Sequence, residues 1–170
     1  MTISMYQASI PVFIRGLENL SDILEKSAMQ AVARKSDPAE LLESRLYADM
    51  FPLTRQVQIA SDTAKGAAAR LAGVEVPSMP DTEASFIELQ QRLARTVAFL
   101  KSIKPEQIDG TEQKTIVLPT RSKGELQFTG QNYLLQQALP NFFFHVTTAY
   151  GILRHNGIAI GKWDYLGSFN

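Results

Sequence analysis

Apolar side chains recur at helical spacing over most of the chain. The first run of them consists of Ile10, Phe13, Leu17, Leu20, Leu24, Ala28 and Ala31. Steps of three and four positions place these residues on one face of an α-helix. We therefore predict a first helix over residues 4–34, with Pro11 bending it or delaying its start.

A second helical pattern follows a break at Ser36. Asp37, Pro38 and Glu40 suit the N-cap, the first position and the third position of a helix, and Gly73 suits its C-cap. We predict one helix over residues 38–72, kinked at Pro52. One stripe of this helix carries Leu42, Leu46, Asp49, Leu53, Gln56, Ala60, Ala64, Ala67 and Leu71. Asp49 and Gln56 are its polar exceptions.

The next segment, residues 74–81, contains two prolines, and we expect it to be a connection across the end of the bundle. Asp81 is the expected N-cap of a third helix that ends at Ile103. The residues expected to face inward are Phe86, Leu89, Leu93, Val97 and Leu100. The residues expected to face outward are Glu88, Gln91, Arg92, Arg95 and Lys101.

Residues 105–129 lack a helical period. They contain two short runs typical of β-strands, KTIVLPT and GELQF, separated by Arg121-Ser122-Lys123-Gly124. This pattern predicts a small hairpin or an ordered long loop. Pro119 argues against a central strand, because proline has no N–H to donate to a neighbouring strand.

A fourth helix is expected over residues 130–156, with a kink at Pro140 and an end at Gly157. The tail that follows, GIAIGKWDYLGSFN, is rich in large apolar side chains. We expect it to pack back on the bundle or on a second subunit. The fold class predicted for residues 1–170 is therefore all-α, a single four-helix bundle domain with an excursion between its third and fourth helices.

Polar side chains interrupt the core-facing stripe of the fourth helix. Steps of four and three give the stripe Leu134, Ala138, Asn141, His145, Thr148 and Ile152. A buried imidazole without a partner would cost on the order of 1–3 kcal/mol. We therefore expect another helix to supply polar partners to His145.

Charge and composition exclude several functions. The chain has 17 basic and 17 acidic residues, which argues against the basic surface that binds nucleic acid. It has no cysteine, so it has neither a disulfide nor a thiolate nucleophile. No stretch reaches the roughly 18 apolar residues that span a bilayer, and the first residues do not resemble a signal peptide. We expect a soluble, cytoplasmic protein.

Two segments of the chain resemble a known family. NFFFH at 141–145, followed by ILRHNG at 152–157, resembles the closing helix of the DinB/YfiT-like superfamily, where two histidines four apart precede Leu-Arg-x-x-Gly. PNFFFH at 140–145 and GKWDYLG at 161–167 are most similar to a branch of that superfamily with unknown function.

The resemblance implies a DinB-like four-helix bundle. Relatives hold a divalent metal with three histidines, one from the second helix and two from the fourth. Some are transferases or isomerases that use low-molecular-weight thiols, and many are dimers, so we expect a homodimer.

This chain departs from the pattern of the three histidines. Asn141 stands where the first histidine of the fourth helix would be, the second helix has no histidine, and Gln56 or Asp49 is the nearest substitute. His155 lies about 15 Å farther along the helix than His145. The intact metal site is therefore absent, with His145 and Asp49 left as weak candidate ligands, and the sequence identifies no cofactor.

The roles of His145 and Asp49 stay open. His145 is either a core histidine bonded to Asn141, Gln56 or water, a ligand-binding group or general base, or a metal ligand. Asp49 either pairs with a basic residue, such as Arg15 or Arg45, or orients the imidazole.

Three functions follow from these alternatives. The first is binding of a small molecule in a pocket between the second and fourth helices. The residues expected to line this pocket are Asp49, Gln56, Asn141, His145 and Thr148. The second is a metal- or thiol-dependent transferase or isomerase that uses His145. The third is a non-catalytic interaction protein with a polar core.

Overall fold

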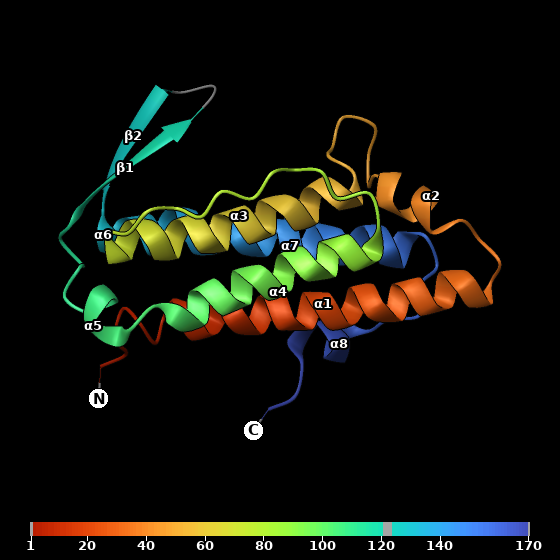
Figure 1. The fold of residues 1–170 in the computed structure, drawn as a ribbon, viewed down its shortest axis with the longest axis horizontal. Coiled ribbons are helices and arrows are strands. Elements are labelled where there is room, and N and C mark those ends of the chain that lie inside the picture. Colours follow the sequence, from red (N-terminus) through yellow and green to blue (C-terminus); the bar gives the residue numbers. More distant parts are fainter. Residues whose placement is uncertain (1, 121–123, 170) are drawn as a thin grey trace.

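Four long helices of the computed structural model pack side by side as a bundle (Figure 1), and the structure describes residues 2–120 and 124–169. The helices are α1 (Ile10–Ala33), α3 (Leu53–Ala72), α4 (Phe86–Ser102) and α7 (Leu139–His155). α3 packs against α7 and α4, and α1 packs against α4 and α7. Their apolar faces form one continuous core, which confirms the predicted helical bundle.

α1 is the longest of these helices, and it begins at Ile10 rather than at the predicted residue 4. Pro11 lies in its first turn, where a backbone N–H would have no partner within the helix. Within residues 2–120 and 124–169, no helix is both long and apolar enough to cross a membrane.

The prediction of one kinked helix over residues 38–72 was wrong. α2 (Pro38–Glu43) is a short helix, capped by the Asp37 carboxylate, which accepts the Ala39 N–H at 2.9 Å. The chain then forms a loop over residues 44–52, and Pro52 becomes the N-cap of α3. Because proline cannot donate within a helix, the break lies on its N-terminal side. Asp49 consequently lies exposed in this loop and not on the stripe of α3.

The connection over residues 73–85 runs along the bundle rather than across its end. α3 and α4 point in the same direction, so the chain returns the length of α3 before α4 begins (Figure 1). Three side chains of α3 hold this segment, and one of them, Gln58, donates to Glu83 at 2.9 Å. Lys65 donates to the Pro77 carbonyl at 2.8 Å, and Arg55 pairs with Asp81.

α4 begins at Phe86 with Ser85 as its N-cap, so the prediction of Asp81 as the cap was wrong. The Ser85 hydroxyl accepts the Glu88 N–H at 3.2 Å, and the Glu88 carboxylate accepts the Ala84 N–H at 2.6 Å. This reciprocal arrangement satisfies N–H groups that a helix start leaves free.

Arg92 of α4 was expected to face outward, but its side chain is fully buried. It donates to both carboxylate oxygens of Glu83 at 3.1 Å and to Asp62 at 2.6 Å. The carboxylates come from the 73–85 connection and from α3. Helical periodicity within α4 could not reveal contacts with either segment. The apolar residues predicted to face inward are buried as expected.

The excursion between α4 and the last long helix contains the predicted hairpin. After α5 (Pro105–Ile108), β1 (Thr115–Thr120) pairs antiparallel with β2 (Gly124–Thr129), with Leu118 opposite Leu126. In a sheet of two strands each strand is at an edge, which accommodates Pro119. Arg121, Ser122 and Lys123 of the predicted turn lie outside the described residues.

The last long helical segment changes its winding before Pro140. α6 (Gly130–Asn132) leads into the π-helix η1 (Tyr133–Ala138), which continues into α7. In η1 the Leu139 N–H donates to the Leu134 carbonyl, five residues earlier. Pro140 has no N–H for the usual bond four residues back, so the altered winding lies where the α-helical ladder is interrupted.

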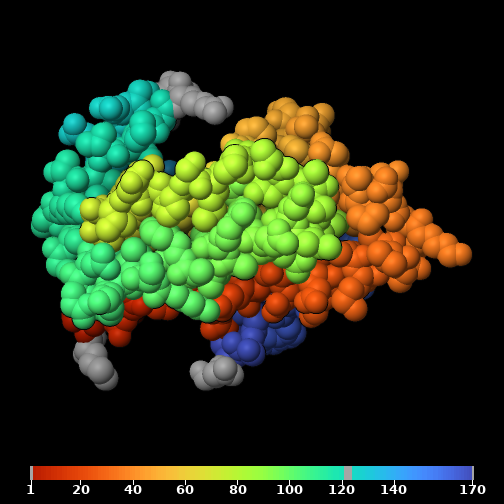
Figure 2. Space-filling model, in the orientation of Figure 1, coloured from red at the N-terminus to blue at the C-terminus, as the bar shows by residue number. Residues whose placement is uncertain are grey.

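The C-terminal tail packs on α1, as one of the two expected alternatives. α8 (Lys162–Leu166) contacts α1, and Figure 2 shows its blue atoms beside the red and orange atoms of that helix. Arg15 of α1 donates to the carbonyls of Leu166 and Ser168 at 2.8 and 3.1 Å. These bonds hold the tail to the bundle.

Candidate functional site

His145 of α7 and Gln56 of α3 form a polar pair inside the bundle. Nδ1 of His145 lies 2.7 Å from Oε1 of Gln56, and both side chains are almost fully buried. The Gln56 amide nitrogen donates to the Phe51 carbonyl at 3.0 Å, which orients the amide oxygen toward the imidazole. Because that oxygen only accepts, Nδ1 carries the proton and Nε2 keeps its lone pair.

The Nε2 atom of His145 has access to solvent. Among the described residues, every fully buried side-chain nitrogen or oxygen has a hydrogen-bond partner, whereas Nε2 makes no hydrogen bond with any of them. The ring as a whole is 8% exposed. The Nε2 edge is therefore the part of this largely buried ring that solvent can reach.

Burial controls the charge of His145. Loss of hydration, together with the nearby positive charge of Arg55, lowers the pKa of the imidazole from 6.5 to about 4. His145 is consequently neutral at pH 7, with an N–H at Nδ1 and an acceptor at Nε2. Chemically, this group can accept a hydrogen bond or bind a Lewis acid.

One exposed aromatic ring contacts the imidazole, and a second belongs to the residue whose carbonyl holds Gln56. The Phe144 ring stands edge-on to the imidazole, with 5.2 Å between ring centroids. Phe51, whose carbonyl holds Gln56, has its own ring beside the Arg55 guanidinium, 6.0 Å from the ring centroid. Phe51 and Phe144 are 54% and 55% exposed, and of these two rings it is Phe144 that contacts the imidazole.

Asn141 does not join the imidazole. Its amide nitrogen donates to the Thr63 hydroxyl of α3 at 2.9 Å. Thr63 lies seven positions, or about two helical turns, after Gln56. Two polar pairs therefore connect α3 and α7, one through His145 and one through Asn141.

Thr148 and Asp49 also lie apart from the pair. The Thr148 hydroxyl donates to the Phe144 carbonyl of its own helix at 2.7 Å, as threonine side chains within helices commonly do. Asp49 is exposed in the loop over residues 44–52. Gln56 and Asp49 were the two candidates for the position where relatives have a histidine on the second long helix. Gln56 contacts His145, and Asp49 does not.

The donors at this site do not fit a divalent metal. Among the residues that the structure describes, no group of three or more His, Cys, Asp or Glu side chains is placed to hold a metal ion. The polar side chains near the imidazole are the neutral amide of Gln56 and the cationic Arg55, and neither is a good ligand for a transition metal. One amide oxygen, that of Gln56, already accepts from Nδ1.

Sequence periodicity did not identify Thr63, Arg55 and Phe51 as neighbours of the candidate residues. Thr63 could have been found, because it shares a face of α3 with Gln56 at a spacing of seven. Arg55 acts through its charge and Phe51 through its backbone carbonyl and the fold of the loop. Neither effect has a pattern in the sequence.

Comparison with known proteins agrees with this architecture. Residues 5–166 match the family described as Domain of unknown function (DUF1993). A DinB family member protein from Shewanella denitrificans has a crystal structure that is similar over 96% of this chain and 92% of that one, with 42% sequence identity and a TM-score of 0.89. A search of curated proteins finds no match. The chain therefore belongs to the DUF1993 family, a branch with the DinB-like fold and no assigned function.

Proposed function

We propose that this protein binds a small molecule at the exposed face of His145, through a hydrogen bond from the ligand to Nε2. The observation that carries the proposal is the 2.7 Å contact between His145 Nδ1 and Gln56 Oε1. That contact determines the tautomer and directs an unshared lone pair toward solvent. A buried, oriented acceptor beside apolar groups is a common element of ligand sites.

The surroundings favour a ligand with an aromatic or apolar body. The rings of Phe51 and Phe144 are more than half exposed, and Phe144 contacts the imidazole edge-on. A flat ring placed against Phe144 would gain from burial of apolar area, at roughly 25 cal/mol for each Å². The polar group of the same ligand would then donate to Nε2.

Binding is better supported than general-base catalysis. An efficient general base has a pKa near the working pH, whereas burial and Arg55 lower the pKa of His145 to about 4. An imidazole with that pKa is a weak base at pH 7. It remains a good acceptor, because it is neutral and held in one orientation by Gln56.

The proposal is tested with phenol, which has an aromatic ring and an O–H donor, and with anisole, which keeps the ring and lacks the donor. We expect phenol, and not anisole, to shift the ¹⁵N resonance of His145 Nε2. The shift should persist in Asn141→Ala, which removes the other polar pair of the α3–α7 interface, and the heat of phenol binding should be lost in His145→Ala. Equal effects of phenol and anisole, or no change at Nε2, would contradict the proposal.

A further inference from the structure

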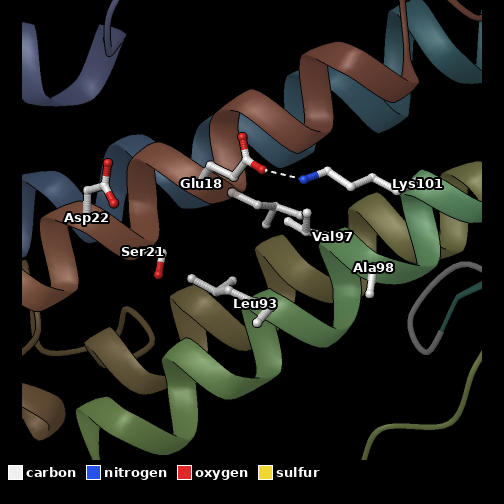
Figure 3. Close-up of a pocket in the computed structure, with 9 residues that line it drawn as sticks. Glu18, Ser21, Asp22, Leu93, Val97, Ala98 and Lys101 are labelled. Carbon is white, nitrogen blue, oxygen red and sulfur yellow. Dashed lines mark hydrogen bonds and ion pairs between the residues drawn. The ribbon is translucent and has the colours of Figure 1, made fainter.

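A groove of about 350 Å³ lies between α1 and α4, lined by neither His145 nor Gln56 (Figure 3). Its floor is apolar. Leu17 of α1 and Leu93 and Val97 of α4 form part of this floor, and each is at least nine-tenths buried. The volume is near the lower end of the range found for sites that take small molecules.

Small side chains keep the groove open. Ala94 and Ala98 of α4 line it one helical turn apart, and both are exposed. A larger side chain at either position would extend over the floor, since residues four apart in a helix point in the same direction. The opening is therefore a consequence of the side chains present and not of a gap in the core.

The polar groups of the groove are placed at its two ends. At one end Lys101 of α4 donates to Glu18 of α1 at 2.9 Å (Figure 3). Ser21 and Asp22 of α1 line the other part. Within the part of the chain that the structure describes, neither the Ser21 hydroxyl nor the Asp22 carboxylate has a hydrogen bond or an ion pair.

Ser21 differs in its bonding from another serine of the same helix. Ser27, further along α1, donates its hydroxyl to the Ile23 carbonyl at 2.7 Å, which is the common arrangement. Ser21 makes no such bond, and Figure 3 shows its hydroxyl on the side of α1 that faces α4. It is thus free to bond a group that enters the groove.

The charges around the groove favour a cation. Glu18 is neutralised by Lys101, which leaves Asp22 as the excess negative charge among the groove's charged side chains. Lys26, one turn after Asp22, is paired with Asp164 of the tail and also attracts Asp22. The two carboxylates together carry one charge more than Lys26 neutralises. The Asp22 end of the groove therefore has a negative potential above an apolar floor.

We propose that this groove is a second ligand site, which takes a small organic cation with an apolar body. The apolar body lies on Leu17, Leu93 and Val97, and the ammonium group bonds the Asp22 carboxylate and the Ser21 hydroxyl. This site is independent of the one proposed at His145, because the two share none of their residues.

Hexylammonium is the probe, compared with hexanol and hexanoate, which have the same chain length and a neutral or a negative head. We expect hexylammonium to shift the methyl resonances of Leu93 and Val97 and to bind severalfold more tightly than the other two. Binding should weaken as salt rises, since the contact with Asp22 is exposed. Equal binding of all three probes, or shifts elsewhere on the protein only, would overturn the proposal.

Paired variants separate the head group from the groove. Asp22→Asn should reduce hexylammonium affinity severalfold, and Glu25→Gln, which removes an exposed charge of α1 outside the groove, should not. Ala98→Leu should fill the groove and abolish binding, and Gln91→Leu, at an exposed site on the same helix, should not. Unchanged binding in both Asp22→Asn and Ala98→Leu would overturn the proposal.

A separate control distinguishes the two sites. His145→Ala should leave hexylammonium binding unchanged, and Ala98→Leu should leave the effect of phenol on His145 unchanged. The groove could instead be covered by a second copy of the chain. Sedimentation measures the oligomeric state of Ala98→Leu and of the unmodified chain to test this. If Ala98→Leu dissociates a dimer and the unmodified chain does not bind hexylammonium, the proposal is overturned. The groove would then be an interface with a second copy of the chain.

Discussion

Gln56 accepts the Nδ1–H of His145 at 2.7 Å, although 89 residues separate them in the sequence. The amide belongs to α3 and the imidazole to α7, so the packing of these two helices decides which ring nitrogen carries the proton. The acceptor that remains, Nε2, is the atom on which the proposed function depends.

Replacement of Gln56 by glutamate should change the charge of His145. A carboxylate next to Nδ1–H stabilises the imidazolium, so Gln56→Glu should raise the pKa of His145 from about 4 toward or above its ordinary value of 6.5. An NMR titration of the imidazole measures this. Gln136→Glu adds the same charge at an exposed site of η1 and should leave the pKa of His145 unchanged; an equal shift in both variants would contradict direct contact with Gln56.

Stability should depend on pH through His145. Its pKa is about 4 in the folded chain and near 6.5 when unfolded, so the unfolded state binds the proton first as pH falls. The free energy of unfolding should therefore be full above pH 6.5 and decrease by up to roughly 3 kcal/mol as pH falls to 4. Denaturant titrations of the unmodified chain and of His145→Gln isolate this contribution as a difference. Parallel pH profiles would show that the pKa is not lowered.

The buried ion pair of Arg92 and Glu83 should be important for stability. Arg92 is fully buried and Glu83 nearly so, so Arg92→Met leaves a buried carboxylate without its main partner. We expect a loss of about 3–5 kcal/mol in the free energy of unfolding. Arg95→Met is the matched control. Arg95 lies 3.8 Å from Glu83 with its side chain 60% exposed, and its loss should cost less than about 1 kcal/mol.

Two glycines in helices should respond oppositely to alanine. At Gly16 of α1, a Cβ would come within 2.6 Å of the buried Phe142 ring, whereas at Gly151 of α7 a Cβ would meet nothing within 4 Å. Gly151→Ala should stabilise the protein by about 0.5–1 kcal/mol through helix propensity. Gly16→Ala should destabilise it by about 1–3 kcal/mol through overpacking. Denaturant unfolding measures both, and equal effects would contradict the close contact of α1 with α7.

Helical periodicity predicted much of the fold because most core residues lie within regular helices. The stripe of α7 placed His145 inward, and the contact with Gln56 satisfies the predicted need for a partner from another helix. Where the prediction failed, non-local contacts decided the structure. Arg92 has a charge typical of a surface, yet carboxylates from α3 and from the 73–85 connection surround it.

The position of Asp49 shows a second limit of periodicity. Apolar residues continue at helical spacing through residues 42–53, so the pattern alone predicts an unbroken helix. In the structure α2 ends at Glu43 and Pro52 is the N-cap of α3. The Leu53 N–H donates to the Ser44 carbonyl at 3.0 Å, which closes the loop between them. A bond between backbone atoms has no counterpart in the side-chain pattern, and for this reason Asp49 was placed in the wrong element.

The tautomer and pKa of His145 test the central claim most directly. Long-range ¹H–¹⁵N spectra of the imidazole, recorded between pH 3 and pH 8, distinguish the two ring nitrogens. The account predicts a proton on Nδ1, an unprotonated Nε2 and a pKa of about 4. A neutral ring protonated at Nε2, or a pKa near 6.5, would contradict it.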